Sequence, residues 1–365
     1  MAARRSSVIM QPTTLCNLNC SYCYLPFRRH VRRMPLAVAQ AVAASIVPWT
    51  ERAAVEVCWH GGEPLTAGPA HLGRLMDCFA GLDVVHGVQT NATLVDEAWA
   101  EFFLERGVRV GVSIDGPPED NQQRVDWAGR SAFDRIVRGI RLLVTREMTV
   151  SVIAVVSDPT PERARKLYTF VADLGAAWLG VNIEEREGSN NRRTAPPESQ
   201  VADFWAALIA AWQANPTVKL READRALSYA RNFLNGERNC ESAHRLTPLD
   251  PLPTIAWNGE VTLISPELAG FRSDRYGDFS CGNVLRTPLD RHPNRHAGGM
   301  GPRVPAWHRR VSRNLPLFRV LRRRSSLEPL LRARPDGRHR NRLLSQQQNR
   351  SHRRNNAPYL ALGGG

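Results

Sequence analysis

The sequence predicts an α/β protein with a largely parallel sheet. In residues 1–289, short β-rich apolar runs alternate with longer amphipathic runs, and this alternation repeats six times. The β-rich runs are apolar almost throughout, which is typical of strands in a sheet that helices cover. An open sheet and a barrel both satisfy this pattern, and both bind ligands at the carboxyl ends of their strands.

The elements follow one another in a regular order. The predicted strands are 7–15, 54–60, 84–90, 108–115, 150–156 and 178–185. The predicted helices are 35–47, 69–80, 95–106, 131–145, 160–174 and 200–213. Pro161 at the start of the fifth helix and Gly175 after its end are typical helix boundaries. Residues 216–250 look helical, and Asn258-Gly259 within 254–264 predicts a hairpin in a second, smaller unit.

Composition excludes several classes of protein. The chain has 365 residues, of which 42% are hydrophobic and 23% charged, so it is neither disordered nor collagen-like nor a small disulfide scaffold. No apolar run approaches the ~20 residues that span a bilayer. The basic N-terminus lacks the apolar stretch of a signal peptide, so we expect a cytoplasmic protein. In that compartment clustered cysteines favour metal binding over disulfides.

The net charge of +14 is unevenly distributed along the chain. Residues 290–365 contain 18 arginines, no lysine and three acidic residues. Residues 1–289 contain 31 basic and 32 acidic side chains and are therefore nearly neutral. The basicity thus belongs to the C-terminal tail.

Three cysteines follow the first predicted strand in the segment CNLNCSYC. Cys16, Cys20 and Cys23 have C-x3-C-x2-C spacing, so three thiolates on one loop can bind three irons of a 4Fe-4S cubane. The fourth iron would then remain open to a substrate. Structural zinc is the main alternative, but it takes four closed ligands, and the nearest histidine, His30, lies beyond Pro26.

With Tyr22 and Tyr24, the segment CNLNCSYCY resembles the radical S-adenosylmethionine (SAM) superfamily. This resemblance implies a partial (β/α)6 TIM-like barrel for residues 1–215. It also implies that the open iron binds the amino and carboxylate groups of SAM. Electron transfer from the cluster would then cleave SAM to a 5′-deoxyadenosyl radical.

Candidate SAM contacts lie at the ends of the following strands. They are Gly61, Gly62, Glu63, Asn91, Ser113 and Arg124. The glycines of GGEP permit close backbone approach, and Glu63 with nearby carbonyls could receive the SAM ammonium. Asn91 and Ser113 could bind the sulfonium side chain or the ribose, with a turn or cap role as the alternative. Arg124 could hold the SAM carboxylate, with an ordinary surface arginine as the alternative.

Later segments narrow the resemblance. The chain resembles the radical SAM/SPASM peptide maturases, closest to the cyclophane-forming type that acts on glycine-rich-repeat precursor peptides. The segments that together carry this resemblance are CNLNCSYCYLP, CWHGGEPL, QTNATLVDEAW, VSIDGP, VNIEEREG and SPELAGFRSDRYGDFSCGNV. In such enzymes the radical abstracts hydrogen from a precursor side chain, and the carbon radical joins a nearby aromatic ring. The implied partners are a precursor peptide and an electron donor such as flavodoxin or ferredoxin, without nucleic acid or membrane.

Two other functions fit the same motifs. One is a sulfatase-maturase-like enzyme that oxidises Cys or Ser to formylglycine. The other is an inactive remnant, or a basic binding protein, that has lost its auxiliary-cluster ligands.

The remaining cysteines and acids are assigned less specifically. Cys58 and Cys78 lie in apolar patterns and are expected in the core. Cys240 and Cys281 could ligate an auxiliary Fe-S cluster or lie in the core. The candidate catalytic bases, among which the sequence does not choose, are Asp115, Glu184, Glu185 and Glu187.

The tail departs from the family pattern. SPASM-type enzymes carry a cysteine-rich C-terminal region, yet no cysteine follows Cys281. Codons can be chosen for residues 311–331 that, read one nucleotide later, encode CRATCPYFAFCGGGAPLN, and residues 332–345 continue similarly. We therefore expect residues 216–289 to bridge to a truncated SPASM-like unit and residues 290–365 to be out of frame and poorly ordered. The functional alternative for the tail is a basic RNA- or membrane-binding arm.

Overall fold

The computed structural model describes most of the chain before the Arg-rich tail. The described residues are 7–184, 190, 196–234, 252–263, 266–273 and 277–289. Glu185, Glu187, Cys240 and the predicted tail at 290–365 lie outside them.

A mostly parallel sheet organises the described residues. Its strands are β1 (Ser7–Met10), β2 (Val55–Trp59), β3 (Val84–Thr90), β4 (Arg109–Ser113), β5 (Val150–Val156), β6 (Trp178–Ile183), β7 (Lys219–Leu220), β8 (Thr254–Ile255) and β9 (Val261–Thr262). Their order is β7-β6-β5-β4-β3-β2-β1-β8-β9, and only the β8–β9 pair is antiparallel within this sheet. Among the described strands β7 and β9 do not pair, so the sheet is open. The predicted α/β class is confirmed.

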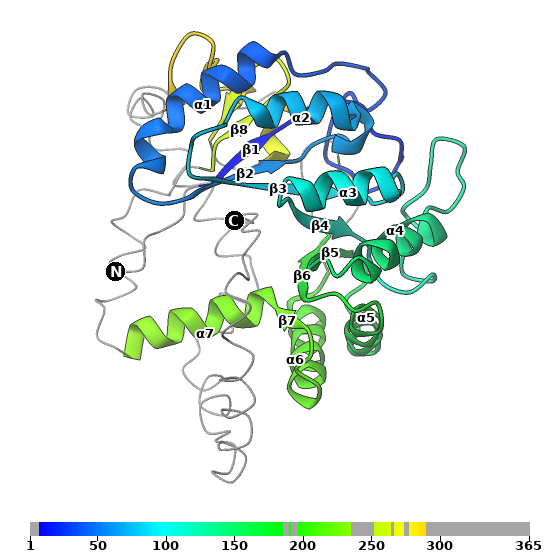
Figure 1. Ribbon diagram of the computed structural model, residues 1–365. Helices are drawn as coiled ribbons and strands as arrows, with labels where there is room; N and C mark the ends of the chain where they lie inside the picture. Colours follow the sequence, from blue (N-terminus) through cyan, green and yellow to red (C-terminus); the bar gives the residue numbers. More distant parts are fainter. Residues whose placement is uncertain are drawn as a thin grey trace. The chain divides into compact units, whose positions relative to one another are not determined.

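Helices connect successive strands. They are α1 (Leu36–Thr50), α2 (Pro69–Asp77), α3 (Glu97–Glu105), α4 (Phe133–Thr145), α5 (Pro161–Asp173), α6 (Glu198–Ala214) and α7 (Arg221–Leu234), with 3-10 turns η1 (Pro64–Ala67) and η2 (Pro266–Leu268). In Figure 1, α1 and α2 lie beside β1 and β2. The Thr160 hydroxyl accepts a hydrogen bond from the Arg163 N–H and caps α5, and Gly175 with φ +74° follows the end of that helix. Within the described part of the chain, no helix has the length and apolarity needed to cross a membrane.

The first strand is shorter than predicted. β1 ends at Met10, whereas the β-rich pattern extends to residue 15. The chain turns after Met10 because the Thr13 hydroxyl accepts a hydrogen bond from the Leu15 N–H at 3.1 Å. Residues 11–15 therefore lead into the cysteine loop instead of extending the sheet.

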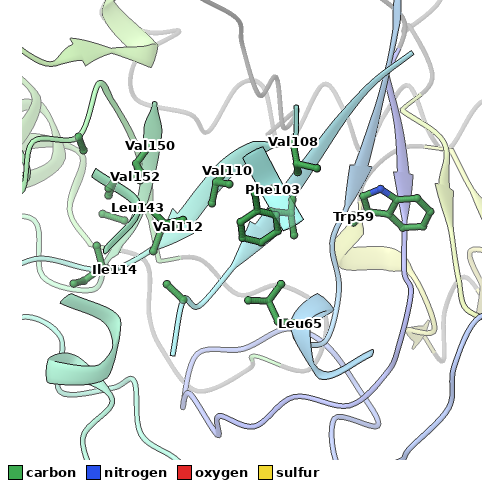
Figure 2. Packing of buried hydrophobic residues seen from close by; sticks show 14 of the residues in the cluster. Trp59, Leu65, Phe103, Val108, Val110, Val112, Ile114, Leu143, Val150 and Val152 are labelled. Atoms are coloured by element: carbon green, nitrogen blue, oxygen red, sulfur yellow. The ribbon is translucent and has the colours of Figure 1, made fainter. Parts of the chain in front are cut away.

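The two faces of the sheet differ in chemistry. Figure 2 shows Val110, Val112, Val150 and Val152 of β4 and β5 in the apolar cluster with Phe103 of α3. Residues paired in a parallel sheet point to the same face, and that face alternates along each strand. The opposite face therefore carries the intervening residues.

That opposite, inner face is where polar side chains occur. Gln89 pairs with Gly111, one position away from the apolar pair Val88 and Val110. Ser113 pairs with Ile153 on the same face. The inner face of β3 and β4 therefore presents an amide and a hydroxyl near the carboxyl ends of the strands.

Segments after residue 215 extend both edges of the sheet. β7 pairs in parallel with β6, and β8 pairs in parallel with β1. The predicted hairpin is present, because β8 and β9 pair across Asn258-Gly259. β10 (Arg272–Ser273) and β11 (Gly277–Asp278) form a separate antiparallel pair. The division at residue 215 into two domains stays a prediction.

Candidate functional site

The cysteine loop directly follows β1 at the carboxyl edge of the sheet. Cys16, Cys20 and Cys23 are free thiols, with Cys20 buried and the other two half-buried. The Cys23 N–H donates to the Cys20 carbonyl at 3.3 Å, which closes a tight turn between the last two cysteines. Three free thiols on one short loop are the donor set that a cubane with one open iron requires.

Burial keeps the Cys16 and Cys20 thiols protonated in the metal-free chain. Desolvation, with a contribution from the Glu63 carboxylate, raises the pKa of Cys16 far above its usual range, and desolvation raises the pKa of Cys20 to about 11. Iron binding must therefore displace protons. Among the described residues, no three His, Cys, Asp or Glu side chains are grouped around a position for a single metal ion. A cubane instead takes one thiolate per iron.

A second loop holds the cysteine loop in place. Asn19 N–H donates to the Val125 carbonyl at 2.7 Å, and Ser21 N–H donates to the Gln123 carbonyl at 3.3 Å. The Trp127 indole N–H donates to the Cys16 carbonyl at 2.8 Å. Hydrogen bonds from the segment after β4 thereby hold the loop that carries the three thiols in position.

The GGEP turn after β2 packs against the start of the cysteine loop. Gly62 has φ +63°, and a Cβ there would lie 2.7 Å from the carbonyl oxygens of Thr13 and Leu15. The Glu63 N–H donates to the same Leu15 carbonyl at 2.8 Å. Gly61 has φ +90°, and a Cβ there would lie 3.1 Å from Gln11. Glycine is therefore required here for both conformation and close approach.

The Glu63 carboxylate faces partners within the protein. It is 1% exposed and accepts hydrogen bonds from the Leu65 N–H, the Thr90 hydroxyl at 2.6 Å and the Asn91 N–H at 2.7 Å. Burial raises its pKa to about 7 although these bonds favour the charged form. The side chain thus ties the end of β2 to the end of β3, and its contact with the SAM ammonium stays a prediction.

Asn91 connects the end of β3 to the cysteine loop. Its side-chain N–H donates to the Asn17 Oδ1 at 2.9 Å, and its Oδ1 accepts from the Thr93 N–H and hydroxyl. Asn17 in turn donates to the Thr93 hydroxyl at 2.8 Å. Asn91 therefore orients the loop between Cys16 and Cys20.

Arg124 is buried against a carboxylate. Its Nε and terminal nitrogen donate to the two oxygens of Asp115 at 2.9 and 2.8 Å. The Tyr22 hydroxyl and the Val155 N–H also donate to Asp115, and the Arg124 guanidinium lies 5.4 Å from the Tyr22 ring centre. The Arg124 guanidinium is thus paired with Asp115, one of the candidate bases, and its contact with the SAM carboxylate stays a prediction. Another candidate base, Glu184, is buried at the end of β6 and accepts from Asn190.

Gln89 is a candidate that the sequence interpretation missed. It is 4% exposed, its side-chain N–H donates to the Ser113 hydroxyl at 2.9 Å, and its Oε1 is buried with no hydrogen-bond partner. Buried acceptors without a partner are rare in folded proteins, which makes the Gln89 Oε1 a candidate contact for a donor group of a ligand. A signal was present in QTNATL, because Gln89 is the second-last residue of β3 and lies on the polar face, two residues before Asn91.

Three further cysteines belong to other described segments of the chain. Cys58 is buried within β2, and Cys78 is half-buried at the end of α2. Cys281 is half-buried beyond β11, where its N–H donates to the Val261 carbonyl at 2.7 Å.

Comparison with known proteins identifies the family. The Radical SAM superfamily model matches residues 10–171. An uncharacterized protein of Synechocystis is 30% identical over 295 residues, which cover 76% of this chain and 72% of that protein. The chain belongs to the radical SAM superfamily. Radical SAM enzymes use a 4Fe-4S cluster and SAM, so the chain is an enzyme whose family cofactors match the donor set described above.

Radical SAM maturases are among the relatives. A cysteine-type anaerobic sulfatase-maturating enzyme of Clostridium perfringens is 32% identical over 54% of this chain and 60% of its own length. A serine-type enzyme of Klebsiella aerogenes is 31% identical over 50% of this chain and 47% of its own length. The matches thus span between about half and three fifths of these relatives.

Solved radical SAM structures share the fold. The structure of anSMEcpe with bound AdoMet superposes with a TM-score of 0.63 at 22% identity, covering 78% of this chain and 80% of that chain. Streptococcus suis SuiB bound to precursor peptide SuiA superposes with a TM-score of 0.61 at 14% identity, covering 80% of this chain and 66% of that chain. The predicted partial barrel is confirmed.

Proposed function

We propose that this chain is a peptide-modifying radical SAM enzyme that crosslinks side chains of a ribosomally made precursor peptide. The observation that carries the proposal is the loop of three free thiols held at the carboxyl edge of an open parallel sheet. Cys16, Cys20 and Cys23 would hold the cluster. When bound, the cluster supplies the electron that cleaves SAM and yields the 5′-deoxyadenosyl radical.

The chain's own residues position the reactants. Gly61 and Gly62 allow the turn after β2 to pack closely against the segment that leads into the cysteine loop, and Gln89, paired with Ser113, carries a buried acceptor without a hydrogen-bond partner on the inner face. Asn91 fixes the loop from β3. The barrel orients the peptide and excludes water from the radical.

A segment near the end of residues 1–289 favours crosslinking over other peptide chemistry. The segment SPELAGFRSDRYGDFSCGNV resembles the cyclophane-forming maturases more narrowly than the cysteine motif does. The SuiB structure, which holds its precursor peptide SuiA, has the same fold. A ribosomally made peptide is therefore the proposed substrate.

Anaerobic reconstitution tests the cofactor assignment. We expect a brown protein that forms 5′-deoxyadenosine from SAM under reductant. The triple variant Cys16→Ala, Cys20→Ala, Cys23→Ala should lose both properties, whereas Cys78→Ala, outside the loop, should retain them. A zinc-loaded wild-type chain would contradict the assignment, and iron binding without 5′-deoxyadenosine would support an inactive remnant.

Co-expression with a glycine-rich precursor encoded by a neighbouring gene tests the substrate. Mass spectrometry should show loss of a pair of hydrogens for each crosslink. An unchanged precursor mass, with SAM cleavage intact, would contradict crosslinking.

Formylglycine formation is the second candidate. It is favoured by the sulfatase-maturating relatives at about 30% identity. Conversion of the Cys or Ser of a sulfatase-derived peptide to formylglycine by the reconstituted chain would establish it.

A further inference from the structure

A strongly basic segment follows the cysteine loop. Residues 27–33, here called the basic collar, contain four arginines and His30 and no acidic residue. All are exposed except Arg28, which is half-buried. In the described part of the chain no carboxylate forms an ion pair with any of the four guanidinium groups. Because residues 1–289 are nearly neutral, this is a local concentration of positive charge.

The basic collar is bonded directly to the loop that carries the thiols. The Cys16 N–H donates to the Arg28 carbonyl at 2.9 Å, and the Thr14 N–H donates to the Arg32 carbonyl at 3.0 Å. The Arg28 guanidinium lies 3.4 Å from the Cys20 carbonyl. A protein bound to the collar would therefore lie beside the cluster ligands.

Aromatic rings contact two of the arginine side chains of the basic collar. The Arg29 guanidinium lies 4.2 Å from the Trp127 ring centre, and the indole N–H of that ring donates to the Cys16 carbonyl. The Arg32 guanidinium lies 5.4 Å from the ring centre of Trp257. Cation–π contacts restrain these side chains, so less side-chain entropy is lost when a partner binds.

Apolar side chains accompany the charges. Phe27 is 52% exposed and Val31 is 68% exposed, although both are large and hydrophobic. Protein interfaces are enriched in aromatic residues and arginine, whereas lysine is depleted. The basic collar has that composition.

We infer that the basic collar is the docking surface for an acidic one-electron donor protein of the flavodoxin or ferredoxin class. This inference rests on the proposed function, because a cluster that cleaves SAM must be reduced from outside. One electron leaves the donor and enters the cluster, so the donor is oxidised by one electron and no atom or proton is transferred. Positive charge beside the cluster steers an acidic donor to the place where that transfer is short.

Charge reversal tests the docking surface. The test variant is Arg29→Glu with Arg33→Glu, which leaves Arg28 and its contact with the cysteine loop intact. The matched control is Arg138→Glu with Arg141→Glu, two exposed arginines of α4. Binding of purified oxidised flavodoxin and ferredoxin to the reconstituted full chain is measured at several salt concentrations. We expect the Kd to rise by about tenfold or more in the test variant, with a flatter salt dependence, and to be unchanged in the control.

A kinetic measurement separates docking from cluster integrity. Formation of 5′-deoxyadenosine should slow in the test variant with reduced flavodoxin or ferredoxin and be unchanged with dithionite, which needs no protein docking surface. Equal Kd values in the test and control variants would overturn the inference. An equal loss of 5′-deoxyadenosine formation with dithionite would also overturn it, because that result indicates a structural role. A test variant that binds the precursor peptide more weakly but the donor protein equally well would overturn it too, because that result indicates a peptide site. A wild-type chain inactive with dithionite would contradict the proposed function instead.

Discussion

Gly62 shows how a single residue sets the distance between two parts of the site. Its positive φ and its contact with the Thr13 and Leu15 carbonyls are separate requirements. Gly107 has nearly the same φ, +60°, but a Cβ there would meet nothing within 4 Å. The two positions therefore separate the cost of the backbone conformation from the cost of crowding.

We predict that Gly107→Ala lowers the free energy of unfolding by about 1 kcal/mol through conformational strain. Gly62→Ala should cost about 2 kcal/mol more, because the methyl group must displace backbone carbonyls. Denaturant unfolding of the metal-free chain measures both. Equal losses would show that the turn moves freely away from the cysteine loop.

The buried Asp115–Arg124 pair is the second prediction at residue scale. Asp115→Ala leaves Arg124 buried without a counter-ion, so we expect the free energy of unfolding to fall by about 3–5 kcal/mol. Adding Arg124→Met should restore a large part of that loss, since no unpaired charge remains. A double variant as unstable as the sum of the single variants would show that the two side chains do not interact.

At the scale of elements, β2 and β3 are joined by a ring pair that depends on a neutral histidine. The Trp59 indole N–H donates to the His86 Nδ1 at 3.3 Å, so that nitrogen must be unprotonated. Desolvation, with the nearby Arg106 charge, lowers the pKa of His86 to about 4. The interface between these strands is therefore sensitive to acid.

We predict that this sensitivity appears as pH-dependent stability. The unfolded chain takes up the His86 proton near pH 6.5 and the folded chain near pH 4, so stability is full above 6.5 and is lost as the pH falls toward 4. The loss is at most about 3 kcal/mol for this residue. Denaturant unfolding at several pH values should show a shallower dependence of stability on pH for His86→Leu than for the wild type.

The sequence could predict the strands and helices but not the side-chain contacts between them. Strand and helix positions were predictable because burial on one face imposes a local apolar period on each element. The cysteine motif was equally local. The partners of Glu63, Arg124 and Gln89 were not predictable, since folding supplies them from other strands and loops; the Trp127–Cys16 bond joins positions 111 residues apart.

For the whole molecule, the distribution of charge and cysteine separates two parts of the sequence. Residues 1–289 are nearly neutral and contain all seven cysteines, whereas the remainder is rich in arginine. A single-nucleotide frameshift near codon 290 is our proposed cause of this change. Codons incompatible with the shifted reading of 311–331 would contradict it.

Iron content tests that proposal at the same scale. The reconstituted chain should bind about four irons, enough for one cubane. A gene with its frame restored should encode a protein with additional iron in auxiliary clusters. Equal iron content in the two proteins would contradict the frameshift.

Among the described strands, β7 and β9 do not pair, so these strands form an arc. Sheets of this kind bind ligands at the carboxyl ends of their strands. Under the proposed function, a peptide lying across that edge would present an internal residue to the site. Its modification would then require no free terminus.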